Sequence, residues 1–372
     1  MIYFDNAATS FPKPREVLLE AERVIRDCGG NPGRSSHVLS LCAAEAIYET
    51  RIAISDAFGF PHPENIVFTM NATHALNIVI KGKLKLGDHV LISNKEHNAV
   101  LRPIATMTRE HGISYSIFDS MMPPEEALLP LIRPETRMII LNHVSNVNGE
   151  KADASAYGAF AARNGLYLVI DASQSLGHIP FSYPTINADA VCAPLHKGLL
   201  SIGGGGMLYL KSGDGIRTLM EGGSGSYSLD LTMPTELPDR FEAGTLPTVA
   251  IATAGSGIRF LSDFGWEQLA AHEAELTESA LDRLQDIKGI AVYSAHPGTC
   301  VFSFSHEKYS AESIGAYLDR HGICVRTGFH CAPLAHKTLN TPKDGAVRVS
   351  FGYANTLSEV DLFYKALKEF LS

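Results

Sequence analysis

The chain has 372 residues, of which 45% are hydrophobic and 19% are charged, and its formal net charge is −9. This is the composition of an ordinary globular protein that is long enough to bury at least one large core. It has no dense run of Lys and Arg, so we expect no nucleic-acid partner. It also has no apolar run of about 18 residues, so we expect no membrane-spanning helix.

The N-terminal residues lack the basic and apolar regions of a signal peptide. Six cysteines are widely scattered and form no CxxC pair: Cys28, Cys42, Cys192, Cys300, Cys324 and Cys331. We therefore expect a cytoplasmic protein whose thiols are reduced, rather than a disulfide framework.

Apolar segments typical of strands alternate with helix-like segments through the middle of the chain. Strands are predicted at residues 66–69, 89–93, 114–118, 138–141, 166–171, 191–193 and 207–210, and helices at 73–86, 98–111 and 153–164. This alternation predicts an α/β fold whose mostly parallel sheet is covered by helices on both faces. Ligands of such sheets bind at the carboxyl ends of the strands.

The pattern changes after about residue 260. A long amphipathic helix is predicted at residues 266–287, strands at 290–293 and 300–303, and helices near 311–321 and at 358–371. Another pair of strands is expected between the last two helices. This part of the chain is typical of a smaller α+β domain.

Lys197 follows an apolar predicted strand, although lysines are mostly exposed. A desolvated lysine with a lowered ammonium pKa can form a Schiff base, and the alternative is a solvated loop lysine. Asp171 ends another apolar strand, where a carboxylate is costly unless it is paired. The protonated pyridine nitrogen of pyridoxal 5′-phosphate (PLP) would be such a partner, with Gln174 near the phenolic oxygen. The alternative is that Asp171 caps the next helix.

Two other segments that follow strands could contact the same cofactor. The imidazole of His97 can stack on a pyridine ring, or His97 can simply begin a helix. Ala72 and Thr73 lie at the start of a predicted helix, where free backbone N–H groups and a hydroxyl can bind phosphate. Thr73 can also be the N-cap of that helix, a role that uses the same geometry.

The C-terminal part contributes Cys331 and Arg348. Arg326 and His330 lie close to Cys331 in the sequence and would favour a nucleophilic thiolate, although an inert cysteine is the commoner case. The histidines around Cys331 match no standard zinc spacing, so we expect no metal. Arg348 lies within a short apolar strand and needs a partner, either a substrate carboxylate or a cross-strand carboxylate.

Together these residues resemble the class V aminotransferase-like PLP enzymes, and among them the cysteine desulfurases and selenocysteine lyases. The resemblance covers nearly the whole chain and rests on the order and spacing of these motifs: YFDNAAT from residue 3, NPGRSSH from 31, FT from 68, EHN from 96, HVSNVNG from 143, DASQ from 171, HKG from 196, RFEAGT from 240, RTGFHCAP from 326 and RVS from 348. It implies the fold type I of PLP-dependent transferases. Residues 14–255 would form a large domain around a mostly parallel, seven-stranded type of sheet, and residues 1–13 and 256–372 a small α+β domain carrying Cys331 and Arg348.

The resemblance also implies a role for each site residue. Lys197, Cys331 and His97 would be catalytic, and Asn146 and Arg348 would bind the substrate carboxylate. Lys197 would hold PLP covalently, together with Asp171 at the pyridine nitrogen, Gln174 at the phenolic oxygen, His97 on the ring, and Ala72, Thr73 and His196 near the phosphate. Thr245 would reach the phosphate of a neighbouring subunit, which implies a homodimer.

The implied reaction converts L-cysteine to L-alanine and leaves the sulfur on Cys331 as a persulfide. The compact loop around Cys331 further implies a sulfur-accepting partner protein. Alternatives are a selenocysteine lyase, a C–S lyase acting on a cysteine derivative, and a non-catalytic sulfur-carrier scaffold. The sequence departs from the family at Pro194, where a Ser or Thr hydroxyl usually meets the phosphate, and Ser224 or Ser226 is a candidate to replace that hydroxyl.

Overall fold

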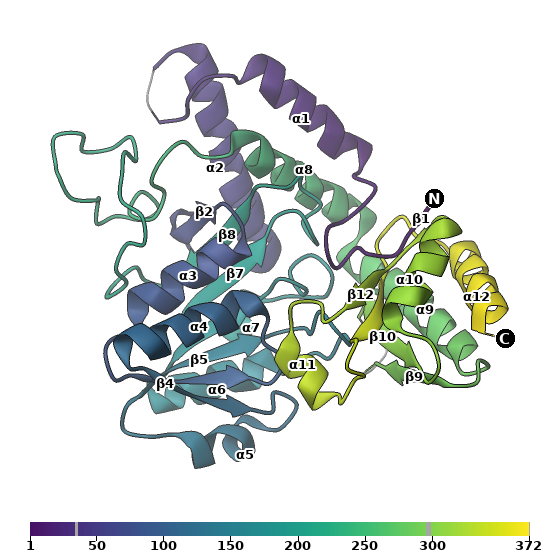
Figure 1. Cartoon of the computed structure of the whole chain (residues 1–372). Coiled ribbons are helices and arrows are strands. Elements are labelled where there is room, and N and C mark those ends of the chain that lie inside the picture. The colour runs from purple at the N-terminus through teal and green to yellow at the C-terminus, as the bar shows by residue number, and fades with distance from the viewer. Residues whose placement is uncertain (34–35, 295–298, 372) are drawn as a thin grey trace.

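The structure is a computed structural model that describes residues 1–33, 36–294 and 299–371. Residues 34–35 of the motif that starts at residue 31 lie outside the described residues. The chain forms a larger lobe around one sheet and a smaller lobe that contains both termini (Figure 1). No helix in the described ranges is both long and apolar enough to cross a membrane.

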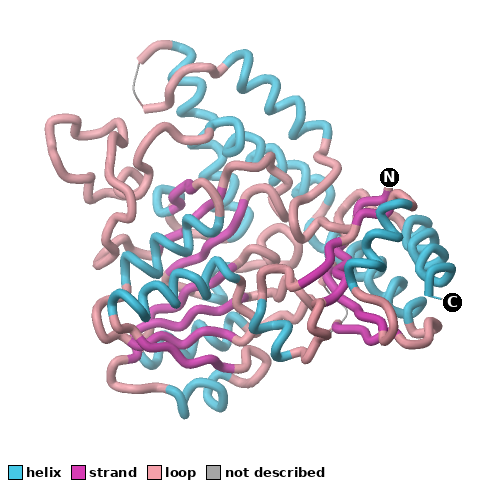
Figure 2. The backbone as a smooth tube through the Cα atoms, in the orientation of Figure 1, coloured by secondary structure: helices cyan, strands magenta, loops and turns pink. Residues whose placement is uncertain are grey.

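Seven strands form the sheet of the larger lobe (Figure 2). Their order is β2 (Ile66–Thr69), β8 (Gly206–Leu210), β7 (Ala190–Pro194), β6 (Tyr167–Asp171), β5 (Thr136–Asn142), β3 (His89–Ser93) and β4 (Ser114–Phe118). Strand β8 is antiparallel to both of its neighbours, and the remaining pairs are parallel. The mostly parallel seven-stranded sheet predicted from the sequence is therefore confirmed.

The strands are apolar along their length because both faces of the sheet are covered. One face packs against α3 (Ala72–Lys83) and α4 (Asn98–His111). The other packs against α2 (Val38–Phe58), α6 (Ala154–Asn164), α7 (Tyr183–Ile186) and α8 (Thr248–Phe264). Alternate side chains such as Ile139 and Ile140 enter the two separate cores.

The smaller lobe has an antiparallel sheet in the order β12 (Arg326–Gly328), β13 (Ala346–Ser350), β10 (Val301–His306) and β9 (Ile290–Tyr293). Helices α9 (Trp266–Leu284), α10 (Ala311–Arg320) and α12 (Leu357–Leu371) pack with it around a third core. Strand β1 (Ile2–Tyr3) pairs in parallel with β11 (Ile323–Cys324), which brings the N-terminus to this lobe. The domain boundaries given above stay a prediction.

Several element ends differ from the prediction. The helix predicted at 73–86 ends at Lys83, because the Lys85 backbone N–H donates to an Asp88 carboxylate oxygen at 2.8 Å in a turn that starts β3. The helix predicted at 266–287 ends at Leu284. Helices α1 (Arg15–Asp27), α2 and α8 are not among the predicted elements, and they pack against one another rather than alternate with strands.

Cys28 and Cys42 form a disulfide, so the prediction that all thiols are reduced is wrong for this pair. Cys28 directly follows α1 and Cys42 lies near the start of α2, and their Cα atoms are 5.1 Å apart. This proximity comes from the packing of the two helices, which the sequence positions of the cysteines do not reveal. The free cysteines are Cys192, Cys300, Cys324 and Cys331.

Thiol titration tests this pairing. Because one disulfide removes two of the six cysteines, the unreduced, denatured protein should show four thiols per chain. Reduction before denaturation should raise the count to six. Six thiols without reduction would contradict the disulfide.

Candidate functional site

A cavity lies at the carboxyl ends of the strands of the larger sheet. Its lining comes from the segments that follow β2, β3, β5, β6 and β7, and consists of Asn71, Ala72, Thr73, His97, Ala99, Asn142, Asn146, Asp171, Ser173, Gln174, Pro194, His196 and Lys197. The structure therefore brings together in one cavity all the predicted site residues that precede position 200: Ala72, Thr73, His97, Asn146, Asp171, Gln174, His196 and Lys197. Parallel strands explain this convergence, because their carboxyl ends meet at one edge of the sheet.

Lys197 follows β7 and lines the cavity. Burial lowers the pKa of its amine to about 8, and the positive charges of Arg348 and Arg326 act in the same direction while Asp171 opposes them. A larger fraction of this amine is therefore neutral near neutral pH than for an exposed lysine. The neutral amine is the form that acts as a nucleophile or a base.

Asp171 ends β6 and is buried. One of its carboxylate oxygens accepts a hydrogen bond of 3.0 Å from the Ser173 backbone N–H, and the described residues include no ion-pair partner for it. The neighbouring Glu96 is also buried, and burial together with the charge of Asp171 raises the pKa of Glu96 to about 8. Because Glu96 is then mainly protonated near neutral pH, Asp171 supplies the negative charge at this edge of the sheet.

His97 is the N-cap of α4, and its Nδ1 accepts a hydrogen bond of 3.0 Å from the Ala99 backbone N–H. The proton of the neutral imidazole is therefore on Nε2. Burial lowers the pKa of His97, which keeps the ring neutral. Asn71, rather than Thr73, is the N-cap of α3, since its side chain accepts from the His74 N–H at 2.8 Å.

Three amide side chains of the cavity have buried oxygens with no hydrogen-bond partner among the described residues: Asn142, Asn146 and Gln174. The Nε2 group of Gln174 donates one hydrogen bond of 2.8 Å to the Ala7 carbonyl and has a second N–H. Unpaired buried polar atoms cost free energy, typically about 1–3 kcal/mol each. The buried Asp171 carboxylate can accept from the protonated ring nitrogen of PLP, and the second N–H of Gln174 can donate to its phenolic oxygen, so the residues fit PLP.

Arg348 is buried in β13 but does not line this cavity. Its Nη2 pairs with the Asp5 carboxylate, and its Nη1 donates to the Asn146 carbonyl at 3.1 Å. The carboxylate partner considered from the sequence is thus present, although it comes from the N-terminal segment. The Nε atom has no partner among the described residues.

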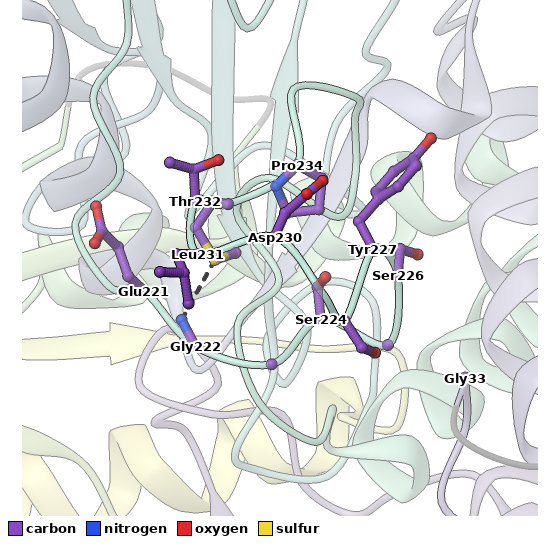
Figure 3. Close-up of a pocket in the computed structure, with 14 residues that line it drawn as sticks. Gly33, Glu221, Gly222, Ser224, Ser226, Tyr227, Asp230, Leu231, Thr232 and Pro234 are labelled. Atoms are coloured by element: carbon purple, nitrogen blue, oxygen red, sulfur yellow. Dashed lines mark hydrogen bonds between the residues drawn. The ribbon is translucent and has the colours of Figure 1, made fainter.

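Pro194 lines the cavity, but neither Ser224 nor Ser226 does so in the same chain. Both serines line a second cavity formed by residues 221–228 and 230–234 with Gly33, which Figure 3 shows. The Ser226 hydroxyl donates to the Asp239 carboxylate. These serines therefore do not replace the missing hydroxyl within one chain. Thr245 is exposed outside the Lys197 cavity, and it accepts a hydrogen bond of 3.1 Å from the Asn31 amide.

Cys331 is exposed in the loop between β12 and α11 (Pro333–Thr338). Its carbonyl accepts a hydrogen bond of 2.7 Å from the Asn98 backbone N–H, next to His97. The carbonyl of His330 accepts one of 2.8 Å from the Asn146 side chain. These two bonds hold the loop against the cavity. His330 and Cys331 both have positive φ, 49° and 57°, which costs free energy in a residue other than glycine unless the surroundings fix it.

A chain of side-chain hydrogen bonds also fixes this loop. The Nε2–H of His330 donates to the Arg326 carbonyl at 3.4 Å, so its Nδ1 must accept from the Nε2–H of His336 at 3.0 Å. The Nδ1 of His336 then accepts from the Thr341 hydroxyl at 2.9 Å. Burial lowers the pKa of His330 to about 2 and of His336 to about 4, which keeps both rings neutral and this direction fixed.

A family model for aminotransferase class-V matches residues 2–363 of the chain. The chain belongs to this family. Class V aminotransferases and the cysteine desulfurases among them are PLP-dependent.

Named relatives of this class V chain are cysteine desulfurases. It is 31% identical to a probable cysteine desulfurase of Mycolicibacterium paratuberculosis over 99% of its length, but it spans only 55% of that protein. It is 30% identical to a probable cysteine desulfurase of Synechocystis sp., covering 99% of this chain and 90% of the relative. The apo structure of cysteine desulfurase from Thermococcus onnurineus NA1 superposes with a TM-score of 0.89 at 29% identity, over 100% of this chain and 94% of the other.

Some residues of the site were not singled out from the sequence. Asn142 pairs with Asp171 across β5 and β6, so its position at a strand end was the available signal. Glu96 precedes His97 in one of the quoted motifs, but only the structure shows that it is buried beside Asp171. Asp5 has no local pattern that indicates a pair with Arg348, since 342 residues separate them.

Replacing the last donor of the histidine chain should loosen the Cys331 loop. Thr341→Val removes one net hydrogen bond of about 1 kcal/mol, so local opening should become about five-fold more frequent. Amide hydrogen exchange of residues 329–332 measures this opening. The matched control is Thr338→Val in α11, whose exposed hydroxyl donates to the Leu334 carbonyl at 2.9 Å. Equal exchange in both variants would contradict the role of the chain.

Proposed function

We propose that this protein is a PLP-dependent cysteine desulfurase. The observation that carries the proposal is the position of Cys331. Its backbone is hydrogen-bonded to Asn98, beside His97, while Lys197 and Asp171 line the adjacent cavity. An exposed thiol next to a site with a buried lysine, whose amine has a lowered pKa, supports sulfur removal rather than simple transamination, for which no cysteine is needed.

Lys197 would hold PLP covalently, and the ring would lie against His97 with its nitrogen toward Asp171. When bound, PLP supplies an electron sink that stabilises negative charge on the substrate carbon atoms. The buried Asp171 carboxylate would keep the pyridine nitrogen protonated, and the second N–H of Gln174 would donate to the phenolic oxygen. The N-terminus of α3, with Ala72 and Thr73, and the side chain of His196 would contact the phosphate.

Arg348 and Asn146 would bind the α-carboxylate of the substrate. Arg348 is buried, and its Nε has no partner among the described residues. Its pair with Asp5 holds the guanidinium in place but also competes with the substrate carboxylate. Burial lowers the pKa of Arg348, yet a guanidinium stays protonated near neutral pH.

The sulfur transfer can be written from the side chains of this chain. The neutral amine of Lys197 removes the α-proton of L-cysteine. The thiolate of Cys331 attacks the substrate sulfur, so that an S–S bond forms while the Cβ–S bond breaks. The electron pair of the broken bond remains on Cβ, which takes up a proton, and the ammonium of Lys197 returns a proton to Cα. The products are L-alanine and a persulfide on Cys331.

Release of the persulfide sulfur requires a thiol acceptor. Cys331 and the neighbouring Phe329 are both exposed, and Phe329 is 47% accessible. This exposed thiol with an aromatic neighbour supports a sulfur-acceptor protein as a partner. A nucleophilic free thiol functions best where it stays reduced, which supports a place in the cytoplasm, whereas the disulfide of Cys28 and Cys42 is more typical of an oxidising compartment.

The loop between β8 and α8 supports a homodimer. It extends away from the larger lobe in Figure 1, and its side chains Leu229 and Leu231 are 98% and 104% exposed. Tyr227 of the same loop is also exposed, and Figure 3 shows it directed away from the neighbouring serines. Contiguous exposed apolar side chains are typical of a protein interface. A second subunit covering this loop would bring Thr245 toward the partner's phosphate site.

Attachment of PLP to the cofactor-free protein should depend on pH with a midpoint near 8. The neutral amine is the nucleophile, and burial lowers the pKa of Lys197 to about 8, so the rate should rise with pH through that value. An ordinary lysine would place the midpoint at about 10.4. Stopped-flow absorbance gives the rate, and borohydride reduction followed by peptide mass spectrometry identifies the modified residue.

Lys13 is the matched control for this experiment, because burial also lowers its pKa to about 8. Lys13→Ala should retain one adduct per chain, whereas Lys197→Ala should lose it. An adduct on Lys13, or none on either lysine, would overturn the assignment of Lys197.

Cys331→Ala should reduce alanine formation from L-cysteine at least about 100-fold, the scale expected when a reacting group is removed. Alanine, sulfide and the mass of the Cys331 peptide are measured with and without a thiol reductant. Cys324→Ala, in the neighbouring strand β11, should keep wild-type activity. Full alanine formation by Cys331→Ala would indicate a C–S lyase, and activity on L-selenocysteine alone would indicate a selenocysteine lyase.

Leu231→Asp should weaken the dimer at least about ten-fold, because an unpaired charge is then buried in the interface. Light scattering coupled to size exclusion gives the mass at several protein concentrations. Leu86→Asp is the control, since Leu86 is 81% exposed outside this loop. A monomeric wild type would contradict the homodimer, and an unchanged Leu231→Asp dimer would place the interface elsewhere.

A further inference from the structure

Three buried side chains with metal-binding atoms converge outside the Lys197 cavity. His178 lies in the segment after β6, Glu273 lies in α9, and Cys300 directly precedes β10. They are only 6%, 3% and 3% exposed. The cluster therefore joins a loop of the larger lobe to a helix and a strand of the smaller one.

The spacing of these atoms is wider than that of a strong hydrogen bond. His178 Nδ1 lies 3.3 Å from each Glu273 carboxylate oxygen and 3.8 Å from Cys300 Sγ. Hydrogen bonds between charged nitrogen and oxygen atoms are usually about 2.7–2.9 Å long. In tetrahedral zinc sites, bond lengths of about 2.0–2.3 Å place neighbouring ligand atoms roughly 3.3–3.6 Å apart. Since all three donor atoms lie within 4.8 Å of one another, small side-chain rotations would complete such a geometry.

The charges of the cluster also suit a divalent cation. A thiolate, a carboxylate and a neutral imidazole carry two negative charges, so a bound M²⁺ would leave the buried site neutral. Without a metal, burial and the charge of Glu273 raise the pKa of the Cys300 thiol well above its usual range. A bound cation deprotonates a coordinating thiol. The positive charge of Arg348 also acts on Cys300, but it is itself paired with Asp5.

We propose that His178, Glu273 and Cys300 form a binding site for a divalent cation of the zinc type. Thiolate, imidazole and carboxylate together favour Zn²⁺ and the similar Co²⁺ over Mg²⁺ or Ca²⁺. The described residues contribute three ligands, so water would take the fourth position. The site could not be found from the sequence, because Glu273 lies 95 residues after His178 and 27 residues before Cys300.

Cobalt binding tests this site independently of the PLP reaction. The full-length holoenzyme is treated with a chelator, dialysed and titrated with Co²⁺. Difference spectra report thiolate-to-cobalt charge transfer, and elemental analysis gives the metal content. We expect about one Co²⁺ per chain with a thiolate band, displaced by Zn²⁺.

Single variants locate the metal. Cys300→Ala should lose the thiolate band, whereas Cys192→Ala, which removes another buried free thiol, should keep it. Cys331→Ala should also keep it, which separates this cluster from the histidines near the exposed thiol. Glu273→Gln preserves the shape of the side chain and should weaken binding at least about ten-fold, with folding checked by circular dichroism. No cobalt band in the wild type, or a band that survives in Cys300→Ala or disappears in Cys331→Ala, would overturn the proposal.

Discussion

The site depends on a negative charge that the fold buries without an ion-pair partner among the described residues. Asp171 ends a strand in the middle of a seven-stranded sheet, and its carboxylate has one backbone hydrogen bond from the next residues. Glu96 would add a second charge, but burial raises its pKa to about 8. One anion therefore remains at this edge of the sheet, and a positive charge in the cavity, that of the Lys197 ammonium or of a bound ligand, compensates it. This requirement favours a protonated pyridine ring over a neutral or anionic ligand at the same position.

The second constraint is the conformation of the Cys331 loop. Positive φ at two consecutive residues other than glycine persists only where surrounding contacts determine it. Here Asn98 and Asn146 of the larger lobe donate hydrogen bonds to the carbonyls of Cys331 and His330. The hydrogen bond between the neutral rings of His330 and His336 adds a contact within the smaller lobe. The larger lobe thus sets the position of a thiol that the smaller lobe carries. The chemistry proposed for Cys331 therefore requires that the two lobes keep this position relative to each other.

Part of this arrangement could be predicted from sequence. The apolar runs that end in Asp171 and precede Lys197 are typical of buried parallel strands, so both residues were expected at one edge of the sheet. The helices α1 and α2 and the disulfide between them were not predicted, because they depend on helix packing rather than on alternation with strands. The pair of Asp5 and Arg348 was also not predictable, since it is made by segments from opposite ends of the chain.

Three other long-range contacts share one structural role, because each joins the two lobes. Arg348 of β13 donates to the Asn146 carbonyl after β5, and Cys331 accepts from Asn98 at the start of α4. His178 and Glu273 form a third contact between the lobes, since His178 follows β6 in the larger lobe and Glu273 lies in α9 of the smaller lobe. A cation at that junction would stabilise the contact between lobes without touching the reacting atoms. Cys300 directly precedes β10, and Arg348 lies in β13, which pairs with β10. The position of Arg348 relative to the cavity would then depend on a cation site that takes no part in the reaction.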